Sequence, residues 1–129
     1  MLAQGAVDFE DVVKAIRDYE TDVMGGPVHI EPDDSIIDTM IDLMHEIEKR
    51  DYASTKCAYY MHPVTAEEVF EEQIENNWLS HDMGENARIH GRPIRTHATI
   101  PEDIVLFFAP DAIGLGGKIY HPEMIAYAD

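Results

Sequence analysis

Apolar residues recur at intervals of three and four in three stretches of the chain, which is the spacing of an amphipathic helix. These stretches are residues 8–19, 35–50 and 65–78. In the third stretch, Phe70, Ile74 and Trp78, with Val69 beside them, predict an apolar stripe that faces a sheet. We therefore expect three helices, each with one face buried.

Polar residues mark the expected starts of these helices. Asp8 can cap the first helix, and Ser35 with Asp38 opens the second. Thr65 and Glu68 have the spacing of a capping box, in which a hydroxyl and a carboxylate each accept a hydrogen bond from a backbone N–H. The third helix is therefore predicted to begin at Thr65.

Short runs rich in β-branched and aromatic residues predict strands around the helices. The run 56–61 stops before Pro63, and the run 103–109 is continuously apolar, as in a strand buried on both faces. In the run 88–97 the alternation breaks at Gly91, which predicts a bulge or an edge position. Shorter strands are expected at residues 28–30 and 118–121, and a last half-turn after Pro122.

These elements predict an α+β fold, a small mixed sheet with amphipathic helices packed on it in a single domain. A chain of 129 residues has the length of one ordinary domain. The segment 24–34 contains two glycines and two prolines and is interpreted as a connector. We divide the chain into an N-terminal helix with a flexible connector, residues 1–33, and an α+β core domain, residues 34–129.

The strongest signal in the composition is a net charge of −17, from 26 acidic and 9 basic residues. Such a charge disfavours nucleic-acid binding and makes copies repel one another unless salt screens them. Only four of the basic residues are lysines, and this composition suits a high-salt cytoplasm. A halophilic host and a merely acidic protein are both compatible with it.

Neither a membrane span nor a secretory signal is expected. No stretch approaches the roughly 18–20 apolar residues that cross a bilayer, and the start MLAQGAVDFED lacks a basic region and a long apolar run. We expect an intracellular site of action, or a particle assembled inside a cell. The single cysteine, Cys57, excludes an internal disulfide framework and is interpreted as a small buried apolar residue.

The sequence contains no catalytic motif. The seven histidines have no ligand spacing typical of metal sites, and the run GLGGK lacks the hydroxyl residue of a phosphate-binding loop. Paired carboxylates are abundant and lie on predicted helix surfaces or connectors. We therefore expect no enzyme activity, no cofactor and no metal, although a metal-dependent hydrolase that uses the histidines stays an alternative.

Arginines form a local exception to the acidic background. Arg88, Arg92 and Arg95 place three of the nine cationic residues within eight positions. A guanidinium suits pairing with a carboxylate or a phosphate. The sequence leaves open whether these arginines pair with helices of their own chain or contact a neighbouring subunit.

From Asp34 onward, the order of motifs resembles the axial domain of the major capsid proteins of tailed bacteriophages and archaeal tailed viruses, the shell fold shared with encapsulins. The similarity consists of an amphipathic helix, a strand that ends in an MHP turn, a helix, a strand of the form G-x-P-I, and an IPED turn before an apolar strand. These motifs are the segments 35–50, 61–63, 91–94 and 100–110. A complete shell protein of that family has in addition a long spine helix, an extended loop and an N-terminal arm, so we expect a reduced relative.

The resemblance implies a structural protein of a virus particle, in the capsid, neck or tail, that acts through subunit contacts. Its partners would be other virion proteins and further copies of itself, and its location the virion, after the host cytoplasm. The corresponding loops would place Asp82, Gly84 and Gly116 near neighbours, together with the three arginines. A small acidic adaptor that docks a basic partner is the alternative from another class.

Overall fold

The computed structural model describes residues 9–18, 27–49, 56–75, 88–89, 91–113, 118–120 and 125–128, with Glu75, Arg88 and Ile89 described by their backbone alone. The helices are α1 (Phe9–Asp18), α2 (Ile36–Lys49), α3 (Pro63–Glu75) and the 3-10 helix η3 (Pro110–Ala112). The strands are β1 (Val28–Ile30), β2 (Ala58–Met61), β3 (Arg88–Ile89), β4 (Arg92–Thr96), β5 (Val105–Phe108) and β6 (Ala126–Ala128). They form a mixed sheet in the order β1-β6-β5-β2-β4-β3, which confirms the predicted α+β fold.

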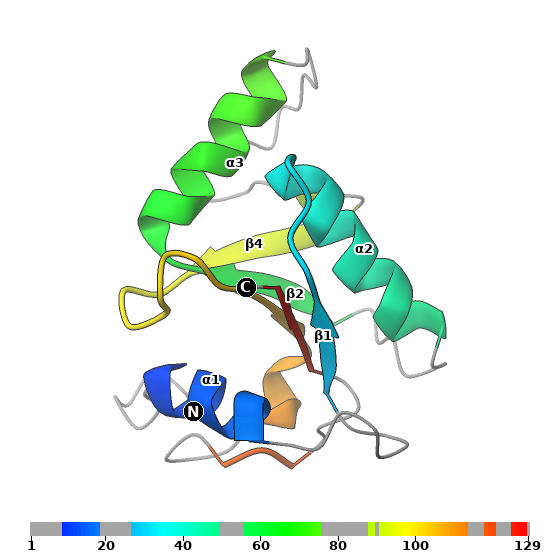
Figure 1. Cartoon of the computed structure of the whole chain (residues 1–129), viewed down its shortest axis with the longest axis vertical. Helices are drawn as coiled ribbons and strands as arrows, with labels where there is room; N and C mark the ends of the chain where they lie inside the picture. The colour runs from blue at the N-terminus through cyan, green and yellow to red at the C-terminus, as the bar shows by residue number, and fades with distance from the viewer. Residues whose placement is uncertain are drawn as a thin grey trace.

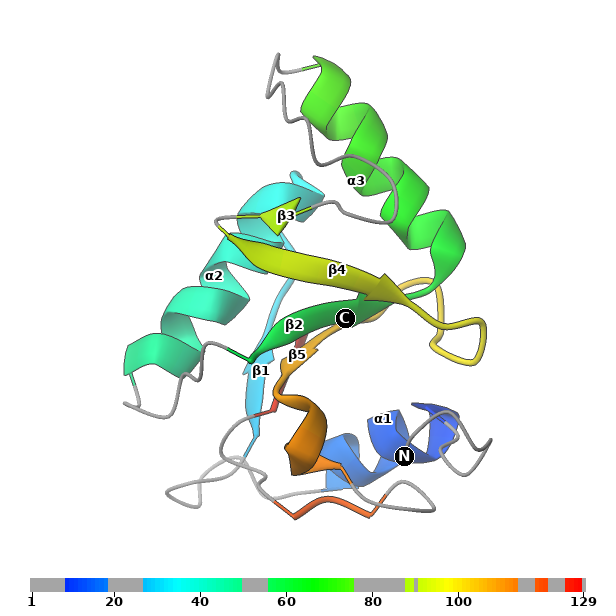
Figure 2. The same cartoon turned by 180° about the vertical axis from the view of Figure 1, so that it is seen from behind.

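Strands β2 and β5 lie in the middle of the sheet as an antiparallel pair and are buried along their whole length. Because successive side chains of a strand point to opposite faces, Tyr59 and Phe107 enter one apolar cluster and Tyr60 and Phe108 the other. Helices α2 and α3 cover the first face, and α1 covers the second (Figures 1 and 2). The fold therefore has three layers.

Helix α2 confirms the second predicted helix and its cap. The Asp38 N–H donates to Ser35 Oγ over 3.2 Å, as expected of an N-cap serine. Glu72 of α3 adds a second, long-range cap, since its carboxylate accepts from Ser35 Oγ and from the Ile36 N–H, the latter over 3.1 Å. This carboxylate joins α3 to the start of α2.

Helix α3 begins two residues before the predicted start, so the predicted capping box is wrong. Pro63 is the first helical residue, a position where the missing N–H of proline is harmless. The His62 ring accepts at Nδ1 from the Val64 N–H over 3.0 Å and serves as the cap. Thr65 instead donates its hydroxyl to the Glu102 carbonyl over 2.6 Å.

The predicted buried stripe of α3 is confirmed at Val69 and wrong at Ile74. Ile74 is 60% exposed and Phe70 only partly buried, whereas Val69 is fully buried and Gln73 is 3% exposed. This rotation of α3 brings Glu72 to the start of α2, where its carboxylate accepts from the Ile36 N–H. Trp78 lies outside the described residues.

The predicted strand 88–97 consists of two strands joined by a tight turn. β3 and β4 are antiparallel, and Ile89 pairs with Arg92 across a two-residue loop. Gly91 has a φ of +79°, a conformation that glycine adopts without steric strain. The predicted edge position is confirmed, since β3 and β4 end the sheet, but the predicted bulge is a hairpin turn.

The C-terminal region contains a strand that the sequence did not predict. β6 lies between β1 and β5, parallel to the first and antiparallel to the second. The strand predicted at 118–121 is, in its described part, a single bridge between Ile113 and Ile119. The half-turn expected after Pro122 lies outside the described residues.

The segment 1–33 contributes α1 and β1 to this same fold. As predicted, α1 buries Phe9, Val12, Val13 and Ile16. Its first N–H, that of Phe9, donates to Thr99 Oγ1 over 3.2 Å, and the Phe9 ring lies 4.8 Å from the His97 ring. Within the described residues, no helix is long and apolar enough to cross a membrane.

The packing of α3 predicts a large loss of stability for one apolar substitution and a small change for another. We expect Val69→Ala to lower the free energy of unfolding by about 2 kcal/mol, because it leaves a cavity in the core. Ile74→Ala should change it by less than about 0.5 kcal/mol, because the side chain is mostly hydrated. Urea titrations of both variants test this, and a larger loss at Ile74 would contradict the observed rotation of α3.

Candidate interaction surface

The alternation of side chains along β4 divides the arginine cluster between the two faces of the sheet. Ile94 belongs to the cluster beneath α2, and Arg92, two residues earlier, lies on that same face. Arg95 pairs in register with Tyr60, whose ring belongs to the cluster beneath α1. The arginines therefore do not form one patch.

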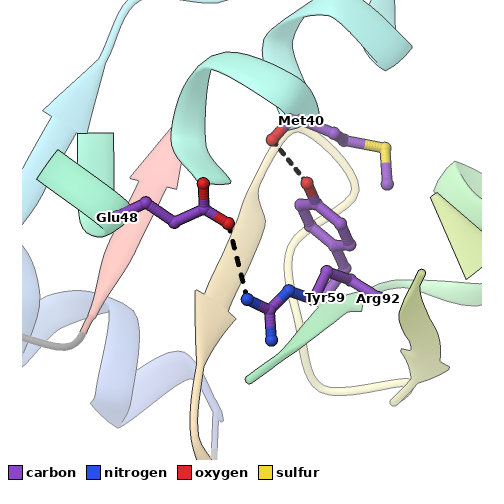
Figure 3. A network of polar contacts seen from close by, with 4 residues as sticks. All are labelled: Met40, Glu48, Tyr59 and Arg92. Carbon is purple, nitrogen blue, oxygen red and sulfur yellow. Dashed lines mark hydrogen bonds and ion pairs between the residues drawn. The ribbon is translucent and has the colours of Figure 1, made fainter. Parts of the chain in front are cut away.

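Arg92 is held by its own chain. Its guanidinium lies 3.4 Å from Glu48 Oε1 of α2 and over the Phe107 ring, with 5.9 Å from Cζ to the ring centre. Only 16% of the Arg92 side chain is exposed, against 41% of Glu48. Figure 3 shows this ion pair between β4 and α2. Arg92 therefore stabilises the contact between the helix and the edge of the sheet.

Tyr59 makes a second link between the sheet and α2. Its buried hydroxyl donates to the Met40 carbonyl over 2.6 Å (Figure 3). Its ring lies 4.7 Å from the Phe107 ring. Burial raises the pKa of the Tyr59 phenol well above its usual value, while nearby Arg92 opposes this shift. The phenol is thus held in its neutral, donating form.

Arg95 is exposed, unlike Arg92, and these are the two arginines of the cluster whose side chains the structure describes. Burial raises the pKa of Tyr60, and the charge of Arg95 opposes that shift. No carboxylate of the described residues forms an ion pair with Arg95. Of the two arginines of the cluster whose side chains the structure describes, Arg95 is the one without an ion-pair partner among the described residues.

The other predicted contact residues are not placed by this structure. Arg88 is described by its backbone alone, where it pairs with Pro93. Asp82, Gly84 and Gly116 lie outside the described residues. Their predicted contacts stay predictions.

Two hollows lie on the α2 side of the molecule, and sequence analysis did not identify either. An open groove of about 650 Å³ separates β1 from α2 and is lined by Val28, His29, Ile30, Asp42, His45, Glu46, Glu48 and Lys49. A smaller recess of about 180 Å³ includes Asp33, Asp34, Glu68, Glu102 and Asp103 in its lining. The order of the strands brings the lining segments together. Local spacing in the sequence therefore does not predict either hollow.

The raised pKa of Asp42 reflects the concentration of acidic side chains around it. A side-chain hydrogen bond with Asp33, partial loss of hydration and the charges of Asp33 and Asp38 raise the pKa of Asp42, with His45 opposing them. In the part of the chain that the structure describes, no three histidine, cysteine or acidic side chains are arranged to hold a metal ion. Cys57 is buried, as predicted.

Comparison with known proteins identifies the class of fold. No family model and no curated protein matches the sequence. The structure is similar to the crystal structure of a virus-like particle from Pyrococcus furiosus, with a TM-score of 0.52 and 17% sequence identity. The match covers 95% of this chain and 62% of that one, so this chain spans less than two thirds of its structural neighbour. The comparison shows that this chain has a fold similar to that of the protein in that particle.

The contacts of Arg92 predict a stability effect that Arg95 does not share. Arg92→Glu should lower the free energy of unfolding by about 1–2 kcal/mol, because it opposes Glu48 with a like charge and removes the cation over Phe107. Arg95→Glu is the matched control, with an expected change below about 0.5 kcal/mol. Thermal and urea unfolding of both variants test this, and equal losses would rule out the bracing role of Arg92.

The buried Tyr59 phenol predicts a decline of stability in alkali. Its pKa is higher in the folded chain than in the unfolded chain, so its stabilising effect is complete below about pH 10 and is lost as the pH rises further. Tyr59→Phe should lower stability at neutral pH by about 1 kcal/mol and make the alkaline decline shallower. Unfolding curves from pH 7 to about 11 measure both effects. Tyr120→Phe, at a side chain 54% exposed, is the control.

Proposed function

We propose that this protein is a structural subunit of a virus-like particle and acts through contacts with other copies of itself and with other particle proteins. The observation that carries the proposal is the match of fold, over 95% of the chain, with a virus-like particle protein. The similarity of motif order to the axial domain of tailed-virus capsid proteins supports a place in the capsid, neck or tail of such a virus. The site of action would be the assembled particle.

A structural rather than catalytic role is part of this proposal. Two buried threonines and a buried tyrosine hold segments of the fold together. Thr39 Oγ1 donates to the Ser35 carbonyl over 3.0 Å and accepts from the Asp33 N–H over 2.8 Å. Thr65 and Tyr59 each donate to a backbone carbonyl. These groups join segments of the chain to one another, which is a role in packing.

An acidic adaptor that docks a basic partner is a second candidate, favoured by the groove between β1 and α2. The groove includes Asp42, Glu46 and Glu48 in its lining, and its volume of about 650 Å³ would admit part of an extended basic segment. Such a protein would work as a monomer with a partner of another sequence. Self-association therefore separates the two candidates.

The particle proposal predicts association that becomes stronger with salt. Each copy carries a net charge of −17, and screening reduces the repulsion between copies. Light scattering after size exclusion, at low and molar salt over a range of protein concentrations, should show a mass that rises with both variables. We expect Lys14→Glu, which makes the net charge more negative by two, to shift the onset of association to higher salt.

A protein that stays monomeric at every salt and protein concentration would overturn the particle proposal. Capture of a basic peptide by that monomer, lost in Asp42→Lys and retained in Asp111→Lys, would support the adaptor instead. Asp111 is exposed on η3 and does not line the groove, which makes it the control for charge alone.

A further inference from the structure

His62 joins the centre of the sheet to α3 through its imidazole. It lies between Met61, the last residue of β2, and Pro63, the first residue of α3. The Val64 N–H donates to His62 Nδ1 over 3.0 Å, and the Ala66 N–H donates to the His62 carbonyl over 3.0 Å. The first turn of a helix has N–H groups without a partner inside the helix, and Ser, Thr, Asn or Asp usually supplies the acceptor. In α3 an imidazole takes that place.

This bond requires the neutral form of the ring. A neutral imidazole has one N–H and one accepting nitrogen, whereas a protonated imidazole has two N–H groups and no acceptor. Because the backbone nitrogen of Val64 can only donate, His62 Nδ1 accepts, and the proton of the neutral ring lies on Nε2. Protonation sets two N–H groups against each other and places a positive charge at the positive end of the helix dipole. Both effects weaken the start of α3.

A second histidine beside His62 makes the same kind of bond. β2 and β4 are parallel, and the N–H of His97, the residue after β4, donates to the Met61 carbonyl over 3.0 Å. His97 Nδ1 accepts from the Thr99 N–H over 3.2 Å, so each ring accepts from the backbone two residues later. Protonation of His97 adds a positive charge at this end of the sheet, which does not compensate a charge on His62.

Carboxylates on the neighbouring elements favour a protonated ring, but only weakly. They lie on α3 and in the turn before β5, at Glu67, Glu68, Glu102 and Asp103. All four are exposed, and in the part of the chain that the structure describes His62 forms no ion pair. Water and salt screen exposed charges, whereas the hydrogen bond from Val64 is a direct contact. The bond therefore determines how acid acts on the start of α3.

We propose that His62 is a pH-sensitive cap, which holds the start of α3 at neutral pH and releases it in mild acid. Histidine is the side chain that ordinarily takes up a proton between about pH 8 and pH 5. The bond from Val64 exists only in the folded chain and only with a neutral ring, so its stabilising effect is complete at the upper end of this range and is lost as the pH falls. The cap belongs to the single chain, so its action and its test do not depend on assembly into a particle.

Two variants of His62 separate the proton from the bond. His62→Asn keeps an acceptor for the Val64 N–H but does not titrate, and His62→Ala has neither property. At about pH 8, the unfolding equilibrium constant of wild type should lie within about twofold of that of His62→Asn and about fivefold below that of His62→Ala, as expected for one cap. At about pH 5, wild type should unfold as readily as His62→Ala and about fivefold more readily than His62→Asn. Urea unfolding at low protein concentration measures these ratios, in which the titration of all other groups cancels.

A local measurement distinguishes the cap from a general effect of acid. In ¹H–¹⁵N spectra, the Val64 amide signal should shift with the same midpoint as the His62 ring, and it should stay in place over this range in His62→Asn. The proposal is overturned if the stability of wild type relative to His62→Asn is the same at both pH values. It is also overturned if wild type equals His62→Ala already at about pH 8, because Nδ1 would then not act as the acceptor.

Discussion

The structure depends on one constraint, which is that the central strands β2 and β5 must be covered on both faces. Tyr59 and Phe107 fill one side and Tyr60 and Phe108 the other, so a single layer of helices would leave aromatic rings in water. α2 is next to β2 in sequence and covers the first face. The second face requires α1, whose Phe9 ring lies 6.0 Å from Tyr60 and 6.4 Å from Phe108. The N-terminal helix, which the sequence analysis placed outside the core domain, thus packs on the core.

Local patterns predicted the elements whose burial is a matter of local sequence. The apolar run at β5 and the spacing of α1 and α2 each specify one buried surface, and the structure confirms them. β6 has no such pattern, because Ala-Tyr-Ala is short and its alanines carry little apolar surface. It becomes a strand only because β1 and β5 leave a place between them, where both alanines are buried. That is a long-range effect, which no window of sequence contains.

Sequence analysis identified the arginine cluster but not the faces on which its members lie, for a related reason. The arginines were recognised as a cluster by their closeness in sequence, but a separation of three residues along one strand places Arg92 and Arg95 on opposite faces. An expected bulge between Ile89 and Ile94 obscured that parity. The hairpin turn at Gly91 lies before Arg92, so β4 itself alternates without interruption. Burial by α2 then decides that Arg92 supports the fold and leaves Arg95 exposed.

In the proposed assembly, charge has a small effect on the strength of association between copies and a larger effect on their orientation. An exposed ion pair contributes about 0.2–1 kcal/mol, too little to hold together two copies that each carry a charge of −17 without help from screening or apolar contact. A misplaced contact opposes acids with acids across most of the surface, and such repulsion rejects wrong orientations. In the proposed assembly, an exposed cation would therefore act mainly by selecting one arrangement among many repulsive ones. In such a protein, the few cations that form no contact within the fold would contribute most to the choice of partner and its orientation.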